Sequence, residues 1–296
     1  MSATSLTWGG RSIPGPGGLP AVAVSLTGPS LAHARAQARS AVEAGADVLE
    51  LRVDLLEEAG ALAAPGPLDA ATATAQVLEC LRGLREAIDA ADGADADGVD
   101  ADTGAPVLLT CRTAAEGGQA HLDAAAYGAL LCSVLDGLAD WAPERRPAAI
   151  DVEVQRGCLR RVCAQAHGLG IDVVASFHDF EATPADEVLE EVLARMACEG
   201  ADLAKIAVWP TSADDVARLL GVCARATAGA GERGGLGVPV AAMSMGALGA
   251  VSRVAPAFGT ALTFAVVPDE QGLARASAPG QLPIQDVRRC LELLRV

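Results

Sequence analysis

The chain contains one lysine, and that lysine lies in an apolar, strand-like segment. Of the 22 basic residues, 21 are arginine and one is Lys205, in the run ADLAKIAV. Arginine cannot replace an amine that must lose a proton and attack carbon. That role requires burial and nearby cations to lower the lysine pKa from about 10.4, and Arg52, Arg112 and Arg253 are candidate cations. The alternative is an ion-paired structural lysine, which the lack of any other lysine disfavours.

His178 is the candidate proton carrier. It follows the run IDVVASF, and residues two apart in a strand share a face, so Ser176 and His178 are expected to point the same way. An imidazole beside a reactive amine can carry protons near pH 7. A histidine at a strand end is, alternatively, often a satisfied polar core residue. The other histidines fall in predicted amphipathic helices or a loop: His33, His167 and His121.

Eight short apolar runs alternate with stretches that carry apolar residues at helical spacing. This alternation predicts an α/β fold in which a parallel sheet closes on itself, a (β/α)8 TIM barrel. An open doubly wound sheet is the alternative, but no glycine fingerprint follows the first run. The predicted strands span residues 21–27, 48–54, 106–112, 148–154, 171–177, 201–208, 238–245 and 261–267. A helix is also expected to begin at Thr183 and Pro184, with the threonine as its cap.

Charged residues recur at alternate positions in the second, third and fourth runs. In VLELRVD, at 48–54, the leucines and valine at 49, 51 and 53 would face the helices, while Glu50, Arg52 and Asp54 point inward. The inward series continues with Arg112, Asp151 and Glu153. Any one of these acids, taken alone, fits a structural ion network. As a set near the carboxyl ends of successive strands, they fit a pocket for a polar ligand.

Composition excludes several classes of partner. Hydrophobic residues make up 51% of the chain and aromatic residues 3%, which suits a tightly packed core of small aliphatic side chains. A formal charge of −16 and a pI near 4.6 disfavour nucleic acid and anionic membranes as partners. The eight cysteines show no CxxC spacing, so we expect reduced thiols and no metal site. Without a long apolar stretch or a secretion-signal pattern, the chain is expected to be soluble and cytoplasmic.

The chain divides into an arm and a single barrel domain. Residues 1–20, rich in Gly and Pro, are expected to form a short hairpin or arm, and residues 21–296 the barrel. The Ala/Asp/Gly tract at 89–105 is interpreted as a flexible insertion without a function.

Seven motifs in sequence order resemble the type I 3-dehydroquinate dehydratases, from about residue 20 onward. They are VSLTG with Ser25, ELRVDLL at 50–56, TCRTAAEGG at 110–118, SFHDFEATP at 176–184, ADLAKIAVWP at 201–210, MSMGALGAVSRVAPAFGTALTFA at 243–265, and ASAPGQ at 276–281. One motif alone would be weak evidence, whereas all seven in order are specific.

The resemblance implies a barrel, usually a homodimer, that converts 3-dehydroquinate to 3-dehydroshikimate in the shikimate pathway without metal or organic cofactor. Lys205 would form an imine with the substrate ketone, His178 would carry protons, and Glu116 would orient His178. The residues implied to bind substrate are Ser25, Glu50, Arg52, Arg112, Arg253, Ser277 and Gln281. Phe180, Met243 and Met245 would form apolar walls, and ASAPGQ would be a lid.

Two other functions stay open at this stage. One is a class I aldolase-like lyase that uses the same imine chemistry on a sugar phosphate, with Gly246, Gly249 and Gly259 cradling the phosphate. The other is a sensor that binds a quinate-like acid without turnover.

Overall fold

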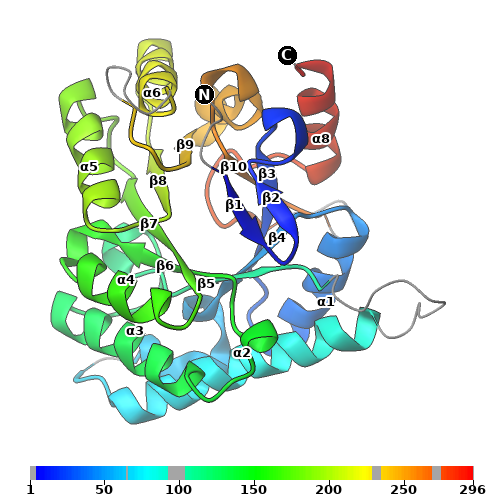
Figure 1. Cartoon of the computed structure of the whole chain (residues 1–296), viewed down its shortest axis with the longest axis vertical. Coiled ribbons are helices and arrows are strands. Elements are labelled where there is room, and N and C mark those ends of the chain that lie inside the picture. Colours follow the sequence, from blue (N-terminus) through cyan, green and yellow to red (C-terminus); the bar gives the residue numbers. More distant parts are fainter. Residues whose placement is uncertain (1–4, 65, 93–103, 229–234, 269–274, 296) are drawn as a thin grey trace.

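Eight parallel strands close into a barrel in the computed structural model, which describes residues 5–64, 66–92, 104–228, 235–268 and 275–295 (Figure 1). From β3 to β9 each strand pairs with the next along the chain, and β10 pairs with β3. The barrel closes where Ala261 N donates to Val240 O at 2.7 Å. The strands are β3 (Ala21–Leu26), β4 (Val48–Arg52), β5 (Val107–Thr110), β6 (Ala149–Glu153), β7 (Asp172–Asp179), β8 (Leu203–Val208), β9 (Val240–Ser244) and β10 (Leu262–Ala265).

All eight predicted strands are present, and the barrel expected from the sequence is confirmed. Because side chains point to alternate faces along each strand, the apolar residues form two layers, one between strands and helices and one inside the barrel. Leu49, Leu51 and Val53 pack outward against the helices, while Val48, Leu108 and Leu203 pack inside the barrel. Because residues two apart share a face, the polar residues that follow these inner ones also point inward, toward the carboxyl ends of the strands.

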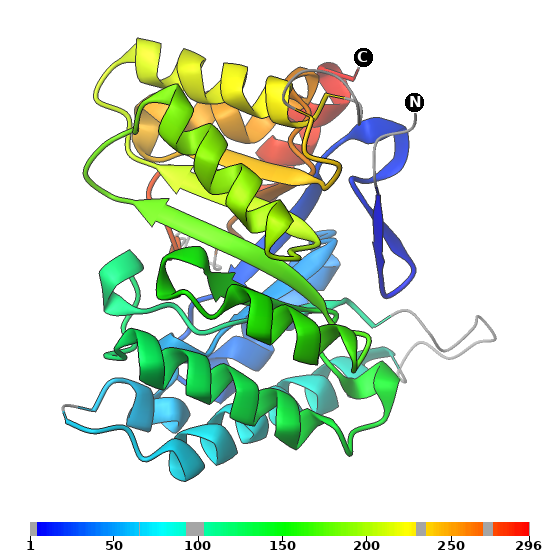
Figure 2. The same cartoon turned by 60° about the vertical axis from the view of Figure 1, so that its left-hand side comes forward.

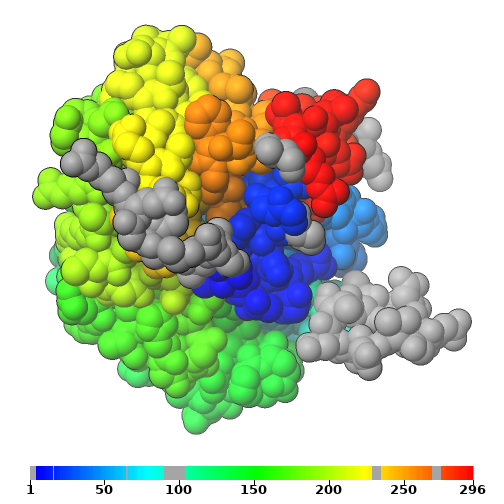
Figure 3. Space-filling model, turned by 45° about the horizontal axis from the view of Figure 1, so that its top comes forward, coloured from blue at the N-terminus to red at the C-terminus, as the bar shows by residue number. Residues whose placement is uncertain are grey.

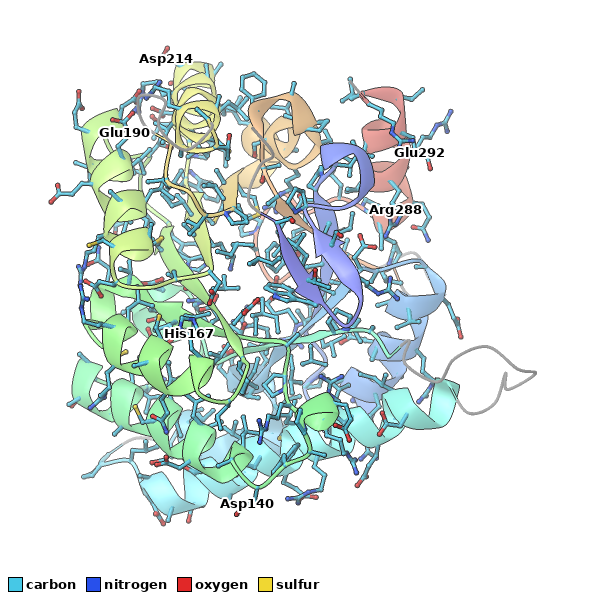
Figure 4. The ribbon with its side chains drawn as sticks, in the orientation of Figure 1. Asp140, His167, Glu190, Asp214, Arg288 and Glu292 are labelled. Atoms are coloured by element: carbon cyan, nitrogen blue, oxygen red, sulfur yellow. The ribbon has the colours of Figure 1, made fainter. Side chains whose placement is uncertain are left out.

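Helices surround the strands on the outside (Figure 1). None of the described helices is both long and apolar enough to cross a membrane. The polar side chains labelled in Figure 4 lie around the periphery of the molecule, away from the barrel axis. The helices are α1 (Leu31–Glu43), α2 (Ala70–Asp92), α3 (Ala124–Leu138), α4 (Leu159–His167), α5 (Asp186–Cys198), α6 (Ala213–Ala226), α7 (Gly246–Gly249) and α8 (Ile284–Leu293).

A two-stranded hairpin plugs the amino end of the barrel. β1 (Leu6–Trp8) pairs antiparallel with β2 (Arg11–Ile13). Trp8 and Ile13 are buried with the inner residues of the strands, and the Trp8 indole donates to Asp172 Oδ2 at 2.8 Å. In Figure 2 the hairpin lies at the end opposite the strand arrowheads, and in Figure 3 it packs beside α8. A site at the carboxyl ends of the strands is therefore open on one side only. The division into an arm and one barrel domain stays a prediction.

Two local predictions are wrong in part. Helix α2 continues to Asp92, so the tract expected to be flexible from residue 89 begins as helix. Residues 93–103 lie outside the described residues, and the role of the insertion stays a prediction. Helix α5 has Ala185 at its N-cap, and the Thr183 hydroxyl donates instead to Trp209 O at 2.9 Å. A tertiary contact to the next βα loop competes with local capping at this position.

Candidate active site

A cleft at the carboxyl ends of the strands holds most of the residues selected from the sequence. The empty space between its side chains is about 450 Å³, including the part that is open to solvent. It draws residues from six of the eight strands or from the segments that follow them, so no single motif builds it. The lining residues are Glu50, Arg52, Arg112, Glu116, Gly117, His178, Phe180, Lys205, Ala207, Met243, Arg253, Phe264, Ser277, Ala278 and Gln281.

A chain of three side chains crosses the cleft. Lys205 Nζ on β8 lies 3.2 Å from His178 Nε2 on β7, and His178 Nδ1 lies 2.9 Å from Glu116 Oε2. Ser176 is the direct partner of Lys205 in the parallel register, which sets His178 one pleat further toward the carboxyl end. The imidazole thus contacts the amine with one nitrogen and the carboxyl group with the other. This is the geometry of a nucleophile, a base and a residue that orients the base.

Burial shifts the pKa of each of these three groups in the direction that favours its neutral form. Burial lowers the pKa of Lys205; the Asp151 carboxylate opposes this shift and the Arg112 guanidinium strengthens it. Burial, followed by Arg112 and Lys205, lowers the pKa of His178 well below its usual value. Burial also raises the pKa of Glu116 to about 8, although Arg112 opposes the rise. The site therefore favours the neutral forms of the amine and the imidazole more than water does.

Arg112 organises the acids around the amine. Its guanidinium donates to Asp151 Oδ1 at 2.8 Å and to Glu153 Oε1 at 3.2 Å, and it lies 3.7 Å from Glu116 Oε2. The other Asp151 oxygen, Oδ2, lies 3.8 Å from Lys205 Nζ and has no hydrogen-bond partner among the described residues. A positive charge at Nζ would thus face a buried carboxylate. Inward-facing acids were predicted from the strand pattern, but this specific neighbour of Lys205 was not.

The opposite wall carries donors for an anionic, hydroxylated ligand. Arg253 is 1% exposed, and its side chain donates to Pro279 O at 3.1 Å. Within the described ranges it forms no ion pair, and burial lowers its pKa to about 10. Arg52 also lines the cleft. A buried guanidinium without an anionic partner fits a ligand carboxylate, which it can bind through two hydrogen bonds.

Hydroxyl and amide groups complete this wall. Gln281 Nε2 donates to Ser277 Oγ at 3.0 Å, and Ser277 Oγ donates to Ser25 Oγ at 2.8 Å. Ser25 in turn donates to Glu50, which also accepts from Thr110 at 3.0 Å. Ser25 does not line the cleft but lies one step behind Glu50 and Ser277. The segment that carries Ser277 and Gln281 follows β10 and is therefore tied to the neighbouring strand β3.

The apolar walls differ from the prediction at two positions. Met243 and Phe180 line the cleft, and the Phe180 ring stacks on His178 with 6.5 Å between centroids. Met245 does not line it: β9 ends at Ser244, and Met245 N donates to Val208 O at 2.8 Å. Strand alternation no longer applies once the chain has left the strand. Phe264 was missed; its ring lies 4.8 Å from Lys205 Nζ, and its inward place two residues after Leu262 was the available signal.

A glycine shapes the segment that presents Glu116. Gly117 has φ of +80°, a conformation that side chains other than glycine rarely adopt. A Cβ at this position would lie 2.4 Å from the Phe180 ring. Phe180 can therefore cover the His178–Glu116 pair only because residue 117 has no side chain.

The glycines considered for a phosphate site have structural explanations. Gly246 N donates to Pro279 O at 3.1 Å, and Gly259 N donates to Pro256 O at 2.9 Å. A Cβ at Gly249 would lie 2.4 Å from the Ser244 backbone. The backbone N–H groups of Gly246 and Gly259 are therefore already bonded to carbonyl oxygens, and Gly249 is required by the close approach of the Ser244 backbone. No group of three or more His, Cys, Asp or Glu residues in the described ranges is placed to hold a metal ion.

Comparison with known proteins decides the family. The model of the family described as type I 3-dehydroquinase matches residues 22–296. The chain belongs to this family. It is 34% identical over 277 residues to the 3-dehydroquinate dehydratase of Klebsiella pneumoniae, with 92% of each chain covered. The enzyme of Salmonella paratyphi B is 33% identical over 281 residues, with 94% of each chain covered.

Solved structures of type I 3-dehydroquinases share the whole architecture. The Geobacillus kaustophilus 3-dehydroquinate dehydratase is 28% identical with a TM-score of 0.77, over 99% of this chain and 96% of that one. The type I enzyme of Clostridium difficile, solved with covalently modified comenic acid, is 27% identical with a TM-score of 0.78, over 99% of both chains. The family, the hydro-lyase class and the barrel expected from the sequence are confirmed.

Proposed function

We propose that this type I 3-dehydroquinase dehydrates 3-dehydroquinate through an imine on Lys205, with His178 as its acid and base. The observation that carries the proposal is the buried Lys205–His178–Glu116 chain, which lies in one cleft with the guanidinium groups of Arg52 and Arg253. The covalently modified acid in the Clostridium difficile relative supports covalent chemistry in this family.

The first step is attack of the neutral Lys205 amine on the substrate ketone. Nitrogen forms a bond to the carbonyl carbon, and the carbonyl oxygen leaves as water with one proton from nitrogen and one taken up from solvent, which gives a protonated imine. His178, 3.2 Å from Nζ, can pass these protons to the departing oxygen. Asp151 Oδ2, 3.8 Å from Nζ, then faces the positive charge of the imine. Its position stabilises the cation more than the neutral amine.

The second step removes a proton from the carbon beside the imine. That proton is weakly acidic in the ketone, but the protonated imine accepts the electron pair that its removal leaves behind, so an imidazole suffices as base. His178 takes the proton at Nε2 and returns it to the β-hydroxyl, which leaves as water as the ring double bond forms. Hydrolysis of the imine then releases 3-dehydroshikimate and the free amine.

The rest of the cleft would hold the ring in position. Arg253 is assigned to the substrate carboxylate, and Arg52, Arg112, Glu50, Ser277 and Gln281 to the surrounding hydroxyl and carboxylate groups. Ser25, which the resemblance implied to bind substrate, is assigned instead to the support of Glu50 and Ser277. Fixing the ring at two ends places its ketone against Lys205, which lowers the entropic part of the barrier. We assign residues 276–281 as a lid, because this segment bridges Arg253 and β3 over the cleft.

We also propose that the protein works in the cytoplasm as a homodimer. The apolar side chains of Leu248, Val251 and Phe258 are all more than a third exposed and lie close together in sequence, which is typical of a surface that meets another protein. Light scattering should give twice the chain mass of 29.8 kDa. A single-chain mass at micromolar concentration would contradict the dimer.

The activity is tested directly on the purified, chelator-treated protein. Adding 3-dehydroquinate should produce the absorbance of the conjugated enone of 3-dehydroshikimate, at a rate proportional to protein concentration. Binding of the acid without any absorbance change would instead support a silent sensor. A sugar phosphate should not compete, because the N–H groups of Gly246 and Gly259, two of the three glycines considered for its phosphate, already donate to carbonyl oxygens.

The pKa of Glu116, about 8, predicts a rise of kcat/KM with pH. Below that pH the carboxyl group keeps its proton and donates it to His178 Nδ1, so Nε2 carries the ring proton and cannot act as a base. Above it, ionised Glu116 accepts from Nδ1–H and leaves Nε2 free. Glu116 and His178 share their protons, so the rise of kcat/KM with pH reports the titration of the pair and not of either group alone.

Glu116→Gln tests which group causes this rise of kcat/KM with pH. The amide cannot titrate, so the rise near pH 8 should disappear, and kcat should fall about 10- to 100-fold because the imidazole loses its orienting partner. If kcat/KM of this variant still rises near pH 8, the titrating group is Lys205 instead.

A further inference from the structure

Asp54 is completely buried but does not line the cleft. Its side chain is 0% exposed, and it lies in the 3-10 turn Val53–Leu55 that follows β4. Each carboxylate oxygen accepts two hydrogen bonds. Oδ1 accepts from Arg52 Nε at 2.9 Å and from Arg112 N at 3.1 Å, while Oδ2 accepts from Arg52 Nη2 at 2.8 Å and from Gln119 N at 3.2 Å.

These four bonds connect two parts of the site. The bidentate pair fixes the guanidinium of Arg52, which lines the cleft. The two backbone bonds hold both ends of the segment from Arg112 to Gln119, and this segment carries Glu116. A shift of either end would move Glu116 relative to His178, which it contacts at 2.9 Å.

Glu153 also holds the segment from Arg112 to Gln119, but only at one end. Glu153 accepts from Thr113 N and Thr113 Oγ1, both at 2.7 Å, and from Arg112. It therefore anchors the first end of the segment alone. Among the described residues, Asp54 is the side chain that contacts Arg52 and both ends of this segment.

We propose that Asp54 is a positioning residue for the dehydration. It aims the Arg52 guanidinium at the substrate and holds Glu116 against His178 at the same time. The inference rests on the roles proposed above for Arg52, Glu116 and His178. Because Asp54 touches neither the substrate space nor Lys205, it acts only through these residues, and imine formation itself does not require it.

Asp54→Asn tests the proposal. The substitution keeps the size of the side chain but turns one acceptor oxygen into a donor that faces other donors. We expect kcat/KM to fall about 10- to 100-fold, with KM raised through Arg52 and kcat lowered through Glu116. Borohydride should still trap the substrate on Lys205. The rise with pH near 8 should also weaken or shift, which a purely structural role would not cause.

The matched control is Asp47→Asn. Asp47 also accepts a backbone hydrogen bond, from Val22 N at 2.8 Å, and also pairs with arginine, Arg288 at 3.0 Å. It lies before β4, at the end of the barrel away from the cleft, so its substitution should leave kcat and KM unchanged. Figure 4 shows its partner Arg288 on α8, at the edge of the molecule.

A double variant separates the effect of Asp54 on Arg52 from its effect on Glu116. If Asp54 lowers kcat through Glu116, adding Asp54→Asn to Glu116→Gln should not lower kcat further, while KM should still rise through Arg52. Fully additive losses in kcat, or a folded Asp54→Asn protein with normal kcat, KM and pH profile, would overturn the proposal.

A replacement variant and two control proteins separate failure of the Asp54 proposal from failure of the proposed function. If Asp54→Asn does not fold, Asp54→Ser, which keeps one acceptor oxygen, goes through the same assays with the same criteria. Wild type and Asp47→Asn are assayed alongside it. Absence of turnover in those two proteins would reject the proposed function, whereas normal turnover in all of them would reject the role of Asp54 alone.

Discussion

Lys205→Ala is expected to lose all measurable dehydration, at least about 10⁴-fold in kcat, or about 5.5 kcal/mol in the activation barrier. No other lysine exists in the chain to replace the amine. Without a nitrogen nucleophile the protonated imine cannot form, and the carbon acid would have to lose its proton with only the neutral ketone as electron sink. Lys205 contacts Phe264 and faces Asp151, so alanine leaves a small polar cavity rather than an unfolded barrel.

Borohydride reduction identifies the residue directly. With substrate present, the wild-type protein should gain irreversible mass on the peptide that contains Lys205, and Lys205→Ala should gain none. Lys205→Arg is the matched control, because it keeps a cation opposite Asp151 yet has no nucleophilic amine at neutral pH. Substantial turnover in either variant, or label on another residue, would reject the imine mechanism.

His178→Ala should lower kcat by about 10²- to 10⁴-fold, the usual contribution of a positioned acid or base. The imidazole lies between the amine and Glu116, so its loss removes the base that takes the carbon proton and the acid that assists the departing oxygen. Borohydride should still label Lys205 in this variant, although more slowly. A deuterium label at the carbon that loses the proton should report whether proton removal has become rate-limiting.

His167→Ala is the control for this experiment. His167 also pairs with a carboxylate, Asp202, at 2.8 Å, but it lies at the end of α4 and is 43% exposed. Its removal should leave kcat and KM unchanged. If His178→Ala changes KM and leaves kcat intact, His178 binds substrate and some other group moves the proton.

The sequence determined the fold and much of the site, because the relevant signals are local. Alternation of side chains along a strand has a period of two, so Glu50, Arg52 and Lys205 could be assigned to the inner face without coordinates. The repeated strand and helix runs predicted the barrel, and the motifs around Glu116 and His178 predicted its family. A single lysine in an apolar strand marked the candidate nucleophile by residue type alone.

Contacts between strands were decided by the tertiary structure, since the register of a closed barrel depends on all eight strands together. The distances from Lys205 to His178 and Asp151 are of this kind, and so is the joint hold of Asp54 on Arg52 and the Glu116 segment. Met245 shows a related limit: the resemblance implied a place in the cleft wall, but β9 ends at Ser244 and α7 begins at Gly246. Periodicity assigns a side chain to a face, while only the packed barrel decides which charged groups meet on that face.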